Sequence, residues 1–154
     1  MATKQEIVTA IRQGIERVDQ TFSGLSDEQL DNRVHDSEGG WTARQILAHL
    51  AGRADSYQMM FQLAEAPAPQ GAPSLDVNHW NQRIVDARAG KSRDELLAEF
   101  RETHERLIQQ VEALPDEMLQ QTVTMPRGPV TVGDALLGSG GMHSVRHAEE
   151  VEQA

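Results

Sequence analysis

Apolar residues recur along this chain at the three-to-four-residue spacing of amphipathic helices. One stripe runs from Ile7 to Phe22, a second from Ile46 to Phe61, a third from Leu97 to Val111 and a last one from Val132 to about Glu152. Such spacing is typical of a helix that buries one face and exposes the other. The pattern therefore predicts four long helices.

Signals for helix starts and stops agree with these stripes. In a capping box, a Ser or Thr side chain and a Glu or Gln three residues later satisfy backbone donors of the first turn. Trp41 and Ile46 stand in the hydrophobic-staple positions around one such box. The sequence has three boxes and one further cap, at Thr3–Glu6, Thr42–Gln45, Ser92–Glu95 and Thr131. Prolines in segment 66–69 and at Pro115 predict where the second and third helices end.

The remaining segments predict connections and short helices. Residues 31–40 are polar and end in two glycines, which predicts a loop with a solvated His35. A connection rich in Pro, Gly and Ala extends to about Ser74, and residues 121–129 are predicted to be extended or looped. A short turn of helix is predicted at 26–29 and a short helix from Val77 to Ala89.

Together these elements predict an all-α fold, a four-helix bundle with one additional short helix. The chain has 154 residues, which is the length of one domain with a substantial core. We therefore expect residues 1–154 to form a single domain.

Composition narrows the partners and the compartment. The chain has 14 basic and 24 acidic residues, a net charge of −10, and such a surface repels phosphate backbones and anionic lipids. No apolar run reaches the roughly 18 residues of a membrane span, and the N-terminus does not read as a signal peptide. Cysteine is absent, which excludes thiolate ligands and a cysteine nucleophile. We expect a cytoplasmic protein that binds neither nucleic acid nor membranes.

The strongest chemical signal is the pair His143 and His147. Residues four apart lie on one helix face within about 6 Å of each other, so two imidazoles can bind one metal ion. On a helical wheel of 100° per residue, both histidines fall near the centre of the stripe that should face the bundle interior. Buried imidazoles need partners, and a shared metal would satisfy both. The alternative is two packed, hydrogen-bonded histidines.

His49 is the candidate for a third ligand. It lies at the edge of the apolar stripe of its helix, a position from which a side chain can reach a neighbouring helix. Three neutral imidazoles would leave a metal with an open coordination position, the layout of a catalytic site. Zinc or nickel would fit this ligand set.

Other residues carry two interpretations each. His104 lies within an apolar stripe, either as a hydrogen-bonded core histidine or as a partner of the site that moves a proton. Arg53 could pair with a surface carboxylate or bind an anionic substrate. Glu150 could orient the His147 imidazole or lie exposed at the helix end. Trp80 could be a packing anchor or line the mouth of a pocket.

Glycines 138, 140 and 141 are unusual inside a helix, where each costs up to about 1 kcal/mol relative to alanine. They could allow tight helix packing. They could also leave space beside a metal for a ligand.

The segment from Gly40 to Leu50, with its Trp-Thr and His49, together with the His-x-x-x-His of the last helix, resembles the DinB-like superfamily. The likeness spans most of the chain. It implies a four-helix bundle with up-up-down-down or related topology, often dimeric, with a metal held by His49, His143 and His147. It also brings relatives that use low-molecular-weight thiols, among them a mycothiol-dependent isomerase, beside many members with no assigned reaction.

These observations lead to three hypotheses. In the first, a three-histidine metal site activates a bound thiol or water, and low-molecular-weight-thiol S-transfer onto a small-molecule substrate is favoured over hydrolysis; His104 and Arg53 assist. In the second, a stress-associated bundle binds metal or a small hydrophobic ligand without turnover; under either hypothesis the resemblance implies a homodimer. In the third, the histidines only pack. Because the chain has no cysteine, any sulfur nucleophile must come from an external thiol.

Overall fold

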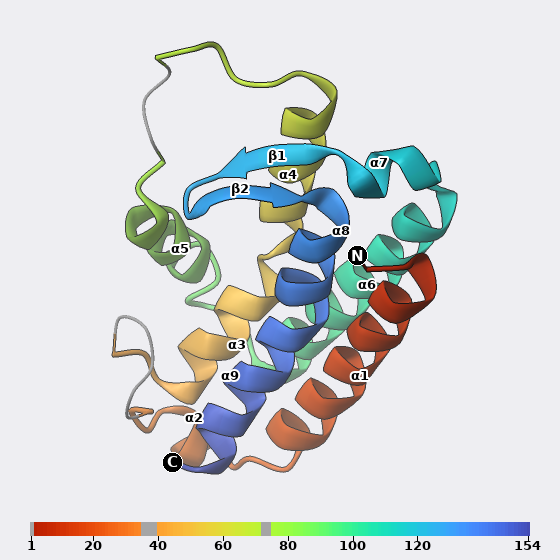
Figure 1. Ribbon diagram of the computed structural model, residues 1–154. Coiled ribbons are helices and arrows are strands. Elements are labelled where there is room, and N and C mark those ends of the chain that lie inside the picture. Colours follow the sequence, from red (N-terminus) through yellow and green to blue (C-terminus); the bar gives the residue numbers. More distant parts are fainter. Residues whose placement is uncertain (1, 35–39, 72–74) are drawn as a thin grey trace.

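The amphipathic stripes form four helical segments that pack around a common core (Figure 1). The computed structural model describes residues 2–34, 40–71 and 75–154, so residues 35–39 and 72–74 of the two predicted connections, His35 and Ser74 included, lie outside it. The first and third segments are single helices, and the second and fourth are each divided. Their bounds are α1 Lys4–Ser23; α3 Ala43–Ala51 with α4 Ala54–Glu65; α6 Arg93–Ala113; and α8 Val132–Ala135, η1 Leu136–Met142 and α9 His143–Glu152.

The first and last segments run in the same direction, and the middle two run against them (Figure 1). Contacts at the ends fix this order. Arg17 of α1 forms a bidentate pair with Glu152 at the end of α9, with N···O distances of 2.8 and 2.6 Å. Lys4, at the start of α1, instead donates to the carbonyl of Glu112 near the end of α6. The all-α four-helix bundle that the sequence predicts is confirmed.

The predicted caps form as expected. The side chains of Thr3, Thr42 and Ser92 each accept a hydrogen bond from the backbone N–H three residues later. The Glu or Gln side chain at that later position accepts one from the backbone N–H of the cap residue. Thr131 accepts from the backbone of Asp134. A fourth capping box, at Ser26 and Gln29, starts the short helix α2, Asp27–Leu30. Local sequence thus determines where these helices begin.

The second long helix is not continuous, which corrects the prediction. It breaks between Ala51 and Ala54, where Gly52 ends α3 and Arg53 begins α4. A Cβ on Gly52 would lie 2.1 Å from a methyl group of Ile84. The break therefore occurs where the chain passes closest to the neighbouring short helix α5, Val77–Asp86.

The last helix contains a π-helical stretch, which corrects the predicted wheel. Its buried residues include a series that recurs at every fourth position, at Val132, Leu136, Gly140, Ser144 and Ala148. At 100° per residue these positions would drift by 40° per step and by about 160° from first to last. The π-helix η1, with its wider i→i+5 turn, absorbs this drift. After η1 the buried residues are Ser144, His147, Ala148 and Val151, so His147 lies within the buried stripe and the half-buried His143 lies at its edge.

Smaller elements close one end of the bundle. The segment predicted as extended forms a hairpin of β1, Thr122–Met125, and β2, Gly128–Thr131. It lies across the end of α4 (Figure 1). The short helix α7, Asp116–Gln120, was not predicted, and α5 ends at Asp86, three residues before the predicted Ala89.

The apolar core has two clusters, one in each half of the bundle. One contains Phe22, Trp41, Ile46 and Phe100, and the other contains Ile7, Ile11, Tyr57 and Leu136. The buried polar side chains among the described residues are Thr21, His49, His104, Ser144 and His147. No helix in the described part of the chain is both long and apolar enough to cross a bilayer.

Candidate metal centre

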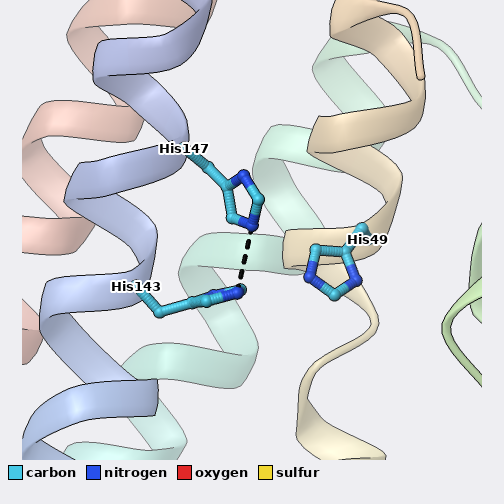
Figure 2. A group of neighbouring side chains, drawn as sticks. All are labelled: His49, His143 and His147. Carbon is cyan, nitrogen blue, oxygen red and sulfur yellow. Dashed lines mark hydrogen bonds between the residues drawn. The ribbon is translucent and has the colours of Figure 1, made fainter. Parts of the chain in front are cut away.

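Three imidazoles from two distant segments of the chain meet inside the bundle. His49 comes from α3, and His143 and His147 lie one turn apart in α9, pointing toward it (Figure 2). His49 and His147 are buried and His143 is half-buried. One nitrogen of each ring lies within 4.8 Å of those of the other two. The structure thus brings together the three histidines that the sequence singled out, in a group that could hold a metal ion.

Three of the six ring nitrogens of this group lack the partners that buried polar atoms need. Neither ring nitrogen of His49 has a hydrogen-bond partner, and Nδ1 of His143 also has none. The Nε2 atoms of His143 and His147 lie 3.0 Å apart, close to the spacing of about 3.3 Å that two nitrogens have around one tetrahedral zinc ion. The donor set therefore fits a shared metal with three nitrogen ligands.

The surroundings keep the imidazoles of His49 and His143 uncharged. Burial lowers the pKa of His49 well below its ordinary value, and the positive charge of Arg53 lowers it further. The same two causes, in the same order, lower the pKa of His143. A neutral imidazole keeps the lone pair that a metal requires. The pocket thus favours the metal-binding form at neutral pH.

Glu150 orients one of the rings. Its Oε2 lies 2.9 Å from Nδ1 of His147, so an Nδ1–H donated to the carboxylate leaves the lone pair on Nε2, which faces His143. The carboxylate also lies 3.9 Å from Nε of Arg146, and it is only 22% exposed. Of the two roles considered for Glu150, the geometry favours orientation of His147 over an exposed helix end.

Trp41 holds His49 in place by ring packing. The ring centroids of the two side chains lie 5.0 Å apart. The indole N–H of Trp41 donates to Oε1 of Gln82 on α5, at 3.1 Å. Since His49 has no hydrogen bond of its own, this aromatic contact and the packing of α3 set the direction of its ring.

A cavity of about 460 Å³ adjoins the cluster, and His143 forms part of its lining. The other walls come from α4, α5, the hairpin, α8 and η1. Trp80 lines the cavity, which agrees with the second of its two predicted roles, a position at the mouth of a pocket. Its indole N–H donates to Ser56 Oγ at 3.3 Å. The volume is in the range of pockets that bind small molecules.

Comparison with known proteins places the chain in a family. The model of the DinB superfamily matches residues 10–151. The chain belongs to the DinB superfamily. No curated protein matches it.

Solved structures of several DinB-like bundles resemble it. YfiT from Bacillus subtilis, described as a probable metal-dependent hydrolase with an unusual four-helix bundle topology, has 24% identity and a TM-score of 0.78, with 97% of this chain and 84% of YfiT covered. A mycothiol-dependent maleylpyruvate isomerase has 16% identity and a TM-score of 0.74, covering 97% of this chain and 60% of the isomerase. At identities below 25%, these TM-scores show a shared fold.

A third neighbour weighs against one of our predictions. The colibactin self-resistance protein ClbS, solved in complex with a dsDNA, has 12% identity and a TM-score of 0.78, covering 99% of this chain and 95% of ClbS. Our expectation of no nucleic-acid partner rested on a net charge of −10. Net charge averages over the whole surface and does not describe any one face, so it does not exclude nucleic acid for a DinB-superfamily bundle.

The sequence reasoning missed Tyr57 as a site residue. This tyrosine is the only one in the chain. It is buried, lines the cavity, and donates a 2.8 Å hydrogen bond to the carbonyl of Ser139 within η1. Burial raises the pKa of Tyr57, so the hydroxyl stays protonated. The signal was present: a lone tyrosine on an apolar stripe needs a partner for its hydroxyl.

His104 lies in the core behind Tyr57. Its Nδ1 lies 2.9 Å from the carbonyl of Phe100, and its Nε2 lies 3.5 Å from the Tyr57 hydroxyl. It is not one of the three clustered histidines. Its contacts are those of the hydrogen-bonded core histidine that the sequence allowed, and through Tyr57 it also touches the cavity wall.

The glycines divide between the two roles proposed for them. A Cβ on Gly141 would lie 2.5 Å from backbone and side-chain atoms of Ala10, so α1 packs directly on this turn. A Cβ on Gly140 would lie 3.3 Å from Ile11. At Gly138 it would meet nothing within 4 Å, and this residue lines the cavity. Gly140 and Gly141 serve helix packing, and Gly138 leaves space beside the site.

His104 should make stability depend on pH. Burial lowers its pKa from 6.5 to about 4. Between these values the unfolded chain takes up a proton that the folded protein does not, so the free energy of unfolding should fall by about 3 kcal/mol from pH 6.5 to pH 4 on account of this residue. Urea unfolding of metal-free protein and of its His104→Leu variant measures this. The other histidines contribute equally to both proteins, so an identical pH dependence in the two would refute the assignment.

Proposed function

We propose that this protein is a metal-dependent enzyme that transfers a low-molecular-weight thiol to an electrophilic small molecule. The observation that carries the proposal is the double position of His143, which belongs both to the three-histidine cluster and to the lining of the cavity. A metal held by His49, His143 and His147 would therefore face a space large enough for substrate. The likeness to a mycothiol-dependent isomerase supports a thiol as the co-substrate.

The residues of the site have separable tasks. A bound zinc or nickel ion would lower the pKa of a thiol or water at its open position and supply a nucleophile near neutral pH. Glu150 fixes the His147 ring through Nδ1. Tyr57 keeps its proton, donates it to the Ser139 carbonyl and so fixes η1 at the cavity wall. The chain supplies no sulfur, since it has no cysteine.

Hydrolysis is the second candidate, and the likeness to YfiT is the observation that favours it. Attack by water needs a base to take the second proton or an acid to protonate the leaving group. Among the described residues that line the cavity, the one acidic side chain is Asp134, which is exposed at the start of α8. A thiol ionised before attack needs no such base, and for this reason thiol transfer ranks above hydrolysis.

The test uses protein purified without an affinity tag. Metal content is measured first, and the zinc- or nickel-loaded protein is then incubated with a panel of thiols and monochlorobimane, whose thioether product fluoresces. We expect conjugation that stops with chelator and in His143→Ala. The matched control is His79→Ala, which removes an exposed histidine outside the cluster and should leave conjugation unchanged.

The outcomes distinguish the hypotheses. Metal-dependent cleavage of esters or amides without thiol conjugation would favour the hydrolase. Stoichiometric metal without turnover on either panel would favour a binding protein. Protein that binds no zinc or nickel would contradict the proposal altogether.

A further inference from the structure

Arg53 occupies the break between α3 and α4, one turn after His49. It is half-buried and lines the cavity together with Tyr57 and His143. Its guanidinium carbon lies 5.6 Å from the centroid of the Tyr57 ring. The helix break thus places a permanent positive charge at the cavity wall that adjoins the histidine cluster.

No carboxylate in the described part of the chain lies within ion-pair distance of Arg53, and its Nε is buried without a hydrogen-bond partner. Other partly buried arginines differ. Arg88 forms two hydrogen bonds to Glu99, at 2.9 and 3.0 Å, and Arg17 is paired with Glu152. The protein has ten more acidic than basic residues. Even so, the pairing of Arg53 with a surface carboxylate, one of its two predicted roles, is not found among the described residues. Arg53 thus has no counter-ion among the described residues, and an anionic ligand in the cavity would supply one.

The charge of Arg53 acts on titratable side chains at the cavity wall and behind it. It is a cause of the lowered pKa values of His49, His143 and His104. It also opposes the rise in the pKa of Tyr57. A metal ion at the histidines would add to the same positive potential. A ligand that enters this space is therefore favoured if it carries a negative charge.

The rest of the cavity is mostly apolar. Its walls include Met59, Met60, Leu75, Trp80 and Met125. Methionine side chains adapt to irregular apolar groups and contact aromatic rings favourably. The wall chemistry thus calls for an apolar body attached to the charged group.

We propose that the cavity binds a small molecule with an apolar body and a carboxylate, and that the Arg53 guanidinium holds the carboxylate beside the histidine cluster. The planar fork of an arginine matches a carboxylate in two parallel hydrogen bonds. That this molecule is the electrophilic substrate rests on the proposed function. Binding of the anion itself does not, because Arg53 belongs to the protein with or without a metal.

The test compares 4-phenylbutyrate with its neutral analogue 4-phenylbutanamide by isothermal titration calorimetry on metal-free protein. We expect the carboxylate to bind at least about tenfold more tightly than the amide. In Arg53→Gln the carboxylate should lose about 10- to 100-fold in affinity and the preference should disappear. Arg83→Gln, which removes an exposed arginine of α5 that does not line the cavity, should retain both affinities.

Three results would overturn this inference: equal binding of the two compounds, binding of neither below about 10 mM, or an unchanged preference in Arg53→Gln. Loss of the preference in Arg127→Gln instead would move the site to the hairpin turn and overturn it as well. The comparison of carboxylate and amide in the unaltered protein stands even if a variant does not fold. Metal content and bimane conjugation, measured on metal-loaded portions of the same preparations, separate failure of this inference from failure of the proposed function.

Discussion

Replacing His49 with leucine should abolish metal binding and, at the same time, stabilise the metal-free protein. Both ring nitrogens of His49 are buried without partners, and an unsatisfied buried polar group costs about 1–3 kcal/mol. Leucine removes that cost, so the metal-free variant should unfold several degrees higher than the parent. It also removes one of only three ligands, so added zinc or nickel should no longer raise its unfolding temperature.

Thermal unfolding with and without metal measures both effects. The parent should gain about 2.7 kcal/mol when the free metal is at 100 times its dissociation constant. Glu150→Gln provides a graded comparison, because it keeps all three histidines and alters only the partner of His147; we expect a 10- to 100-fold loss of affinity. His79→Ala should behave as the parent does.

The opposite signs make this prediction specific. A histidine that merely packs would destabilise the protein when replaced and would leave any metal response intact. A His49→Leu variant that is less stable without metal, or that still responds to zinc and nickel, would therefore contradict the metal centre.

Replacing Gly141 with alanine should destabilise the fold by about 3 kcal/mol. A Cβ there would lie 2.5 Å from Ala10. The atoms that it meets include backbone, which moves less easily than the end of a side chain. Separation of α1 from η1 would also displace His143, two residues on. We therefore expect weaker metal binding as well as a lower urea midpoint at unchanged slope.

Gly138→Ala is the matched control within the same turn. Its added methyl group would meet nothing within 4 Å, and alanine favours helix by up to about 1 kcal/mol over glycine. Stability should be unchanged or slightly higher. If both variants lost stability equally, the cost would come from the π-helical backbone and not from contact with α1.

Local sequence predicted the helix starts because each capping box is complete within four residues. Thr42 and Gln45 form their reciprocal hydrogen bonds whatever the rest of the chain does. The breaks within helices could not be predicted in this way. Gly52 ends α3 where Ile84, thirty-two residues later in the chain, leaves no room for a Cβ, and this contact exists only in the folded protein.

The candidate site was predicted in part. The spacing of His143 and His147 and the edge position of His49 identified the cluster, because these are properties of single helices. The wheel ignored the π-helix, so it put both histidines at the centre of the buried face, whereas His147 is fully buried and His143 lies at the edge. The cavity could not be predicted, since its walls come from α4, α5, the hairpin, α8 and η1 together. Tyr57 was missed because its partner, the Ser139 carbonyl, is 82 residues away.

The π-helix has a consequence for how this protein can diversify. Because η1 accommodates one residue more than a regular helix would, α8 and α9 both keep a buried face toward the interior of the bundle. Deleting a single residue near Gly138 would restore a regular helix without turning His143 and His147 away from His49. It would alter the cavity wall that carries Ser139, the hydrogen-bond partner of Tyr57. A change in chain length, with no change in the histidines, is thus enough to reshape what the site accepts.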